Sequence, residues 1–174
     1  FREALTVPNE ALRYQPPVEV LVYVFDYDIP IRGHSRPPQF EPWLRRLSER
    51  AGVQAVVVRT NLKRHPVFRD VWWYAAHGAC LAAVGHLLSS LIGTLVLSSS
   101  FPRTEPHPSG THFELDPLWS SSRLECVHFG DMLSRSQKLR EIAHEPLLRE
   151  FLRICWENLA DRPNCGVCEK CVRT

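Results

Sequence analysis

The chain has 174 residues, of which 44% are hydrophobic and 23% are charged, and its formal net charge is +2. This composition favours one globular domain with a real core, and the small net charge gives no support to bulk electrostatic binding of nucleic acid. The longest apolar stretch, residues 75–97, is broken by histidine, glycine and serine, so no membrane helix of roughly 20 apolar residues is expected. Because no signal peptide is evident at Phe1, we expect a cytoplasmic protein.

Apolar runs and amphipathic segments alternate along the chain. Residues 18–25 form a continuous β-branched and aromatic run, typical of a strand buried on both faces. Residues 39–51 have the pattern of a helix that ends at Gly52, and residues 53–59 predict a second buried strand. The later segments predict a helix (70–91), two strands (94–98 and 124–128) and two helices (134–144, capped by Ser134, and 146–156).

This order of elements predicts an α/β fold, with a parallel sheet and helices on both faces. In such sheets ligands bind at the carboxyl ends of the strands. Polar side chains follow the predicted strands at these ends, including Asp26, Asn61, the serines of residues 98–100 and Asp131. We therefore expect a ligand site at this edge of the sheet.

Four cysteines near the C-terminus have the spacing C-x9-C-x2-C-x2-C; they are Cys155, Cys165, Cys168 and Cys171. Four thiolates complete a tetrahedral zinc site, and a C-x2-C pair lets two sulfurs from one turn reach the same ion. In a chain without an export signal, this spacing favours metal over disulfides. We predict a structural Zn²⁺ ion in a C-terminal segment, residues 155–174; the alternative is four reduced thiols that are close by coincidence. Cys80 and Cys126 are expected to be buried side chains without a chemical role.

The run from Asn164 to Cys171 (NCGVCEKC) and the helix start from Ser134 to Lys138 (SRSQK) carry a resemblance to a known group. They resemble the PP-loop ATP pyrophosphatases, which have the adenine nucleotide alpha hydrolase-like, Rossmann-like fold. Within that group, the 7-cyano-7-deazaguanine synthases end in the same kind of zinc knuckle. The group's phosphate loop, Ser-Gly-Gly-x-Asp-Ser, has no counterpart here, because the sequence contains no Gly-Gly pair. We expect that loop and the first strand ahead of residue 1, so that residues 1–154 form a nucleotide-binding-like domain without them.

The resemblance implies an enzyme that uses ATP and Mg²⁺ to adenylate a carboxylate or carbonyl oxygen of a small molecule, which a nitrogen or sulfur nucleophile then attacks. It implies nucleotide contacts at the strand ends and the helix start: Phe25, Asp26, Ser99, Ser100, Ser134 and Lys138. The alternatives are an ordinary strand end, a serine-rich loop, a helix cap and a solvated lysine. A different class of function also stays open, namely a non-catalytic, zinc-stabilised nucleotide-binding or interaction module.

The long loop 108–122 contains His112, Asp116 and Trp119, a set of polar and aromatic side chains that suits recognition of a planar substrate. The alternative is a loop whose tryptophan fills the core. Binding of tRNA and formation of a homodimer both stay open at this point, because no charge pattern or repeat decides them.

Overall fold

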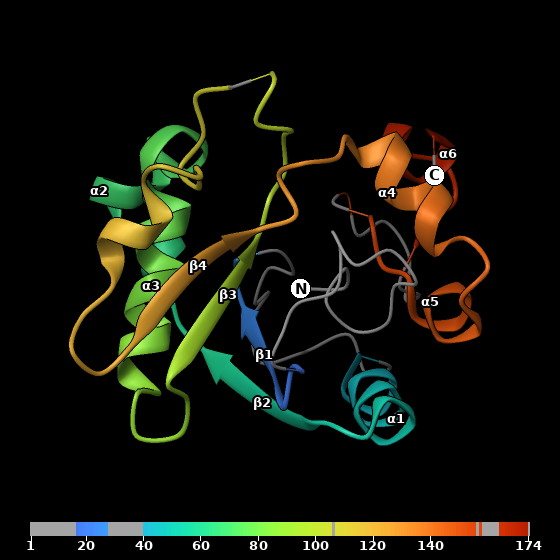
Figure 1. Ribbon diagram of the computed structural model, residues 1–174, viewed down its shortest axis with the longest axis horizontal. Coiled ribbons are helices and arrows are strands. Elements are labelled where there is room, and N and C mark those ends of the chain that lie inside the picture. Colours follow the sequence, from blue (N-terminus) through green and yellow to red (C-terminus); the bar gives the residue numbers. More distant parts are fainter. Residues whose placement is uncertain (1–16, 28–39, 106, 156, 158–163, 174) are drawn as a thin grey trace.

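The computed structural model describes residues 17–27, 40–105, 107–155, 157 and 164–173 (Figure 1). This part of the chain is an α/β structure with two parallel strand pairs. β1 (Val20–Phe25) pairs with β2 (Gln54–Arg59), and β3 (Thr94–Ser98) pairs with β4 (Glu125–Phe129). All four strands lie within two residues of their predicted positions, so the apolar and β-branched runs located them well. The predicted burial of the second strand is wrong, because β2 is exposed or half-buried along its length.

Helices lie on both sides of the strands, with α3 on one side and α1, α4 and α5 on the other (Figure 1). The helices are α1 (Phe40–Ala51), α2 (Pro66–Arg69), α3 (His77–Leu87), α4 (Arg135–Ile142), α5 (Pro146–Phe151) and α6 (Glu169–Arg173). The described chain also contains three short helical turns. Of these, η3 (Leu62–Arg64) and η5 (Asp116–Trp119) are 3₁₀, and η4 (Trp72–Ala76) is a π-turn. Among the described helices, none combines the length and the apolarity that crossing a membrane requires.

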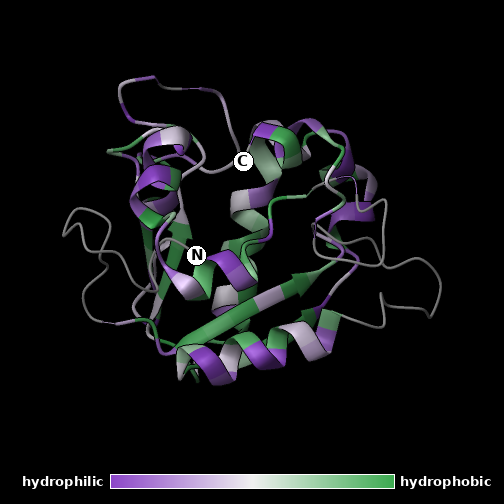
Figure 2. Ribbon diagram, turned by 90° about the vertical axis from the view of Figure 1, so that its right-hand side faces the viewer, coloured by the Kyte–Doolittle hydropathy of each residue, from purple (hydrophilic) through white to green (hydrophobic). Residues whose placement is uncertain are grey.

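Two apolar clusters hold the strands between these helices. Leu21 and Phe25 of β1 pack with Trp43, Leu47 and other residues of α1 and with Phe151 of α5. On the other side, Ala82 of α3 packs with Leu124 and Cys126. Full burial of one large apolar side chain stabilises a fold by about 1.5–3 kcal/mol. The strands are mainly hydrophobic, whereas α1, low in the view of Figure 2, alternates hydrophobic and hydrophilic residues.

Three further expectations from the sequence differ from the structure. The single parallel sheet is not formed by the described residues, because β1 and β3 are not paired with each other. The helix predicted at 70–91 begins as the π-turn η4 and becomes α-helical only from His77, whose Nδ1 lies 3.0 Å from the Trp72 carbonyl oxygen. The last predicted helix, 146–156, ends at Phe151, because Leu152 takes an extended backbone.

The predicted cap of α4 is confirmed. The Ser134 side chain accepts a hydrogen bond from the backbone N–H of Gln137, and the Gln137 side chain accepts one from the Ser134 N–H. This reciprocal capping box satisfies two N–H groups that a helix start otherwise leaves without partners. The capping box therefore fixes the residue at which α4 begins.

Gly78 brings α3 into backbone contact with the loop that contains Gly110. The Gly78 N–H donates to the Gly110 carbonyl oxygen at 3.1 Å, and a Cβ at Gly78 would overlap that same oxygen. Because the overlap is with backbone, Gly78→Ala is expected to lower the free energy of unfolding by about 2–3 kcal/mol, measured by chemical denaturation. Gly93→Ala is the matched control, since its Cβ would meet nothing within 4 Å; it should stay within about 0.5 kcal/mol of the original. Equal stability of the two variants would contradict this packing.

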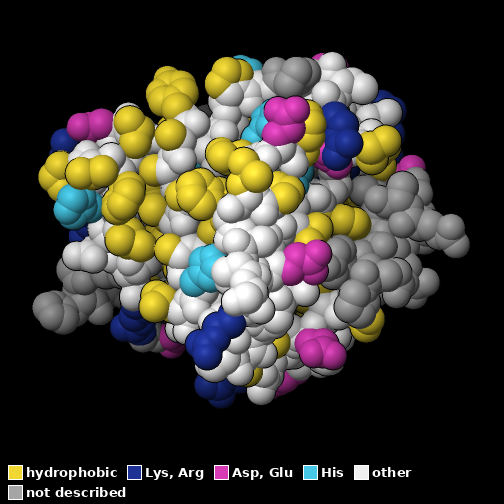
Figure 3. Space-filling model, turned by 60° about the vertical axis from the view of Figure 1, so that its left-hand side comes forward, with side chains coloured by type: hydrophobic (Ala, Val, Ile, Leu, Met, Phe, Trp, Pro, Cys, Tyr) yellow, Lys and Arg dark blue, Asp and Glu magenta, His cyan; other side chains and the backbone are white. Residues whose placement is uncertain are grey.

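Exposed hydrophobic side chains gather on the face that Figure 3 presents, on the side of the molecule where α2 and α3 lie. The exposed apolar residues of these helices and of their neighbours η4 and η5 include Val67, Trp73, Tyr74, Leu87 and Leu118. Exposed patches of this kind often mark interaction surfaces. The homodimer stays a prediction. This exposed apolar surface is one that a homodimer could bury.

Candidate functional site

The four C-terminal cysteines come together in space as their spacing predicts. The Sγ atoms of Cys155 and Cys168 are 4.0 Å apart, those of Cys165 and Cys171 are 3.8 Å apart, and all four lie within 4.8 Å of one another. In a tetrahedral site with Zn–S bonds of about 2.3 Å, neighbouring sulfurs are separated by about 3.8 Å. The four cysteines could therefore hold a metal ion with little movement, and the all-sulfur donor set suits zinc.

Asn164 ties the two cysteine-bearing segments together. Its Oδ1 accepts hydrogen bonds from the backbone N–H groups of Ile154 and Cys155, at 2.9 and 3.2 Å, and its Nδ2 donates to the Leu152 carbonyl oxygen at 2.6 Å. Gly166 takes a left-handed conformation with φ of 80°, which turns the chain between Cys165 and Cys168. The sulfurs are thus positioned by a backbone arrangement that one asparagine side chain braces.

The local electrostatics favour a thiolate at Cys165. Backbone N–H groups of Val167 and Cys168 point at its sulfur and hold the pKa of the Cys165 thiol below its usual range, and the Cys168 N–H lies 3.3 Å from it. Burial has the opposite effect at Cys171, where it raises the pKa of the thiol. Metals bind thiolates, so a cluster that already stabilises one of them is prepared for an ion. Because four cysteines fill a tetrahedral site, it has no open position for chemistry and suits a structural role.

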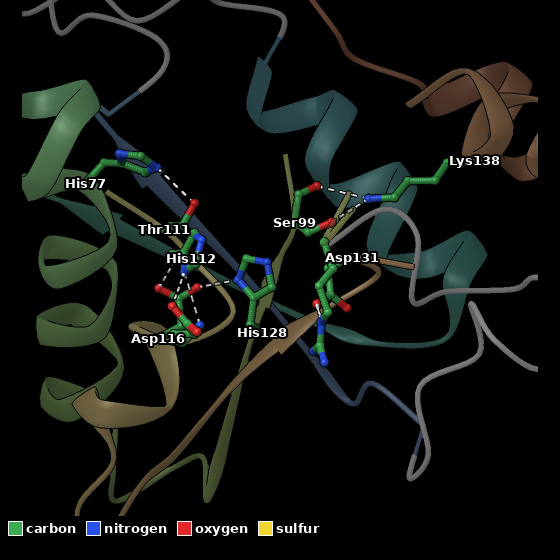
Figure 4. A network of polar contacts seen from close by, with 10 residues as sticks. His77, Ser99, Thr111, His112, Asp116, His128, Asp131 and Lys138 are labelled. Atoms are coloured by element: carbon green, nitrogen blue, oxygen red, sulfur yellow. Dashed lines mark hydrogen bonds and ion pairs between the residues drawn. The ribbon is translucent and has the colours of Figure 1, made fainter. Parts of the chain in front are cut away.

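A second cluster lies at the carboxyl ends of β3 and β4, where Lys138 of α4 reaches Ser99 (Figure 4). The Lys138 Nζ donates to the Ser99 carbonyl oxygen at 3.0 Å and to its Oγ at 2.7 Å. Both residues are buried, with exposed fractions of 4% for Lys138 and 6% for Ser99. The structure thereby brings together two predicted site residues that are 39 positions apart, at the edge where ligands of parallel sheets bind.

The other predicted nucleotide contacts lie at different places. Ser134 caps α4 one helical turn before Lys138, and Ser100 is exposed beside Ser99. Phe25 is 2% exposed and belongs to the cluster beneath α1. Asp26, with a left-handed backbone (φ 77°), is paired with Arg64 through contacts of 2.6 and 2.8 Å. Nucleotide contacts by these four residues stay predictions.

Two of the three predicted substrate-loop residues are engaged with the protein itself. Asp116 has an exposed fraction of 0%; its Oδ2 lies 2.7 Å from Nδ1 of His128 on β4, and its Oδ1 accepts from the His112 N–H at 3.3 Å (Figure 4). Trp119 packs against the Ala82, Leu124 and Cys126 cluster. A substrate contact by either residue stays a prediction. The alternative, a loop whose tryptophan fills the core, fits the packing of Trp119.

His112 lines an open surface cavity of about 580 Å³, together with Tyr74, His107 and Leu118. Nearby, Nε2 of His77 lies 3.2 Å from the Thr111 Oγ1, which fixes the start of the loop against α3. Burial lowers the pKa of His77, so this histidine favours the neutral form. His112 is thus the member of the predicted loop set that lines a concavity.

Sequence reasoning placed Asp131 at the carboxyl edge but missed its pairing with Arg103. Asp131 follows β4 and is 6% exposed, and its Oδ2 lies 2.7 Å from Nε of Arg103. The Arg103 guanidinium also lies over the Phe113 ring, 4.6 Å from its centroid. The position of Asp131 after a strand was a signal for it, but no spacing links it to Arg103.

Comparison of the chain with family models, curated proteins and solved structures gave no match.

Proposed function

We propose that this chain is part of an ATP-dependent adenylating enzyme of the PP-loop pyrophosphatase type, with a structural zinc ion at its C-terminal end. On this proposal, the two strand pairs belong to a Rossmann-like, adenine nucleotide alpha hydrolase-like fold. The ATP phosphates bind at the carboxyl edge of β3 and β4. The observation that carries the proposal is the buried Lys138 ammonium held on Ser99 at that edge.

The side chains at the carboxyl edge of β3 and β4 have some of the properties that phosphate binding needs. A lysine ammonium is a compact positive charge that neutralises phosphate oxygens, and burial strengthens its field. Ser99 holds that charge through two acceptor oxygens, and the Ser134 cap fixes the helix that carries it. The buried carboxylate of Asp131 is the residue here that suits Mg²⁺, although it is now paired with Arg103. What is missing from the sequence is a Gly-Gly loop whose N–H groups would cradle phosphate.

In this assignment bound ATP supplies the adenylyl group, with pyrophosphate as its leaving group. Lys138 binds and orients the phosphates and offsets the charge that develops on them. Ser99 positions the Lys138 ammonium, and the rigid turn into α4 keeps it in place. The zinc site stabilises the C-terminal end of the chain and takes no part in the reaction.

The second candidate is a zinc-stabilised nucleotide-binding or interaction module without catalysis. The lack of any Gly-Gly pair in the 174 residues favours it, because a phosphate loop is the part that an ATP-cleaving site needs most. Both candidates keep the metal site. They differ in whether ATP is consumed. Recognition of tRNA is a further prediction that salt-sensitive binding would reveal.

Binding of ATP tests the assignment of Lys138. With the protein as its natural gene encodes it, Lys138→Met is expected to weaken MgATP binding by about 10- to 100-fold, because a hydrogen bond to a charged group is lost. Isothermal titration calorimetry measures the affinity, and thermal denaturation checks that the variant is folded. Arg140→Met is the matched control, since Arg140 is an exposed cation of the same helix, and its loss removes the same charge. Equal affinities of the two variants, or no MgATP binding by the original protein, would overturn the proposal.

A further inference from the structure

An arginine of the loop after β3 is held at the same carboxyl edge as the Lys138 ammonium. This loop follows the end of β4: the Ser99 N–H donates to the Phe129 carbonyl oxygen at 2.8 Å, and the Arg103 N–H donates to the Asp131 carbonyl oxygen at 2.6 Å. Ser99 also binds Lys138, and Figure 4 shows Asp131 next to Ser99. Two cations, Arg103 and Lys138, are therefore fixed to one short stretch of the edge where ligands of parallel sheets bind.

The Arg103 side chain is held in one orientation by its neighbours. Its Nε donates to the Asp131 Oδ2 at 2.7 Å, and its guanidinium lies over the Phe113 ring, 4.6 Å from the ring centroid. The Asp131 carboxylate is buried, and a buried carboxylate needs a positive charge beside it. A long side chain loses much of its rotamer freedom when it binds a ligand, and here part of that loss occurs before a ligand arrives. The guanidinium is therefore preorganised at the edge.

The contacts with Asp131 and Phe113 leave the outer half of the guanidinium unused. Among the residues that the structure describes, none is a hydrogen-bond or ion-pair partner of Nη1 or Nη2, and the Arg103 side chain is 56% exposed. An arginine and a carboxylate frequently form two parallel N–H···O bonds, but here the Nε contact is made alone. The N–H groups of Nη1 and Nη2 have the fixed spacing that matches two oxygens of a carboxylate or a phosphate. They are available to a ligand without breaking the contact with Asp131.

Neutralising Asp131 does not by itself require an arginine, because a lysine ammonium supplies the same charge. What distinguishes arginine is the planar fork of N–H groups, which binds two oxygens at once. We propose that Arg103 binds an oxyanion, a carboxylate or a phosphate group of a small ligand, through Nη1 and Nη2 at the carboxyl edge of β3 and β4. Asp131 and Phe113 position the guanidinium for this contact. The inference concerns binding alone, so it applies to an adenylating enzyme and to a binding module alike.

Nuclear magnetic resonance of the ¹⁵N-labelled protein, as its natural gene encodes it, tests the site. The Nε–H of Arg103 is held by Asp131 and reports on the guanidinium, and its signal is assigned by its absence from Arg103→Lys. Sodium pyrophosphate and sodium acetate are titrated separately at constant ionic strength, with sodium chloride as the reference and without MgATP. At least one of the two oxyanions should shift the signal along a saturating curve. Saturation by pyrophosphate alone assigns a phosphate group, and saturation by acetate alone assigns a carboxylate. Shifts no larger than those with chloride would overturn the proposal.

Arg103→Lys separates oxyanion binding from the support of Asp131. It keeps a positive charge beside the buried carboxylate but removes the fork, so affinity for the bound oxyanion, followed on backbone amides, should fall about tenfold or more. The midpoint of thermal unfolding should change by no more than about 3 °C. Arg123→Lys, at an exposed arginine of the loop before β4, is the matched control and should bind as the original protein does.

Two results with these variants would overturn the oxyanion site. One is an affinity of Arg103→Lys equal to that of the original protein, which would show that the fork makes no contact with the anion. The other is a midpoint of thermal unfolding that falls as far in Arg103→Lys as in Arg103→Ala. In that case Arg103 would serve to hold the loop against β4, and the loss of binding would follow from the loss of that contact. Because no ATP is present, neither result depends on the outcome of the Lys138→Met experiment.

Discussion

Replacing Cys165 or Cys168 by serine is expected to reduce bound zinc from about one equivalent to less than about a tenth of one. Both sulfurs are buried among the other cysteines, and a serine hydroxyl is a poor ligand for an ion that three thiolates bind. Zinc binding in small zinc domains has an apparent free energy of about 10–16 kcal/mol, and part of it is folding free energy. We expect the variants to lose at least about 3 kcal/mol of stability, because the segment beyond α5 has little other core. Elemental analysis under reducing conditions and chemical denaturation measure the two effects.

Cys80→Ala is the matched control for the zinc variants. Cys80 is also a buried cysteine, but it packs with Trp72 and Ala76 far along the chain from the metal cluster. Its removal leaves a small cavity, so a loss of about 1 kcal/mol and a full equivalent of zinc are expected. Purified original protein that contains no zinc, or serine variants that retain it, would rule out the four-cysteine site.

Asp116→Ala is expected to lower the free energy of unfolding by about 2–4 kcal/mol, because it removes the acceptor of two N–H groups that the fold shields from water. The Asp116 carboxylate is fully buried and lies 2.7 Å from the His128 Nδ1, and it also accepts the His112 N–H. Its loss leaves both nitrogens in the interior without this acceptor, and their desolvation is then uncompensated. The Asp116–His128 contact joins the loop to β4. The variant should therefore unfold at a lower urea concentration than the original protein.

Glu114→Ala is the control for the Asp116 variant. Glu114 is an acid two residues away in the same loop, and its side chain is 76% exposed. Its replacement removes the same charge and should cost no more than about 0.5 kcal/mol. If the two variants were equally stable, the buried pair would not hold the loop, and a role for Asp116 at the substrate would become the better explanation.

Local patterns predicted what depends on neighbouring residues. The β-branched run before Asp26 became β1, the serine before α4 became its cap, and the C-x2-C spacing placed four sulfurs together. Each of these depends on the period of the side chains or on the geometry of one turn. The α/β class followed from the order of the elements, as the parallel pairing of both strand pairs confirms.

Features that depend on distant residues could not be predicted in this way. The region of residues 71–84 is apolar at nearly every position, so no periodicity marks the change from the π-turn to α3 at His77. The early end of α5 coincides with the bond that Asn164 makes to the Leu152 carbonyl, twelve residues back along the chain. The pairings of Arg64 with Asp26 and of Arg103 with Asp131 also bridge segments that no local pattern connects.

Identification of the products of ATP is the most direct test of the proposed function. The zinc-loaded protein, as its natural gene encodes it, would be incubated with MgATP and fractionated mixtures of small carboxylic acids and carbonyl compounds. An adenylating enzyme should release AMP and pyrophosphate in step with one fraction, and Lys138→Met should abolish the release. Formation of ADP and phosphate, or bound ATP that no fraction causes to be consumed, would contradict catalysis by adenylation and leave the zinc-stabilised binding module.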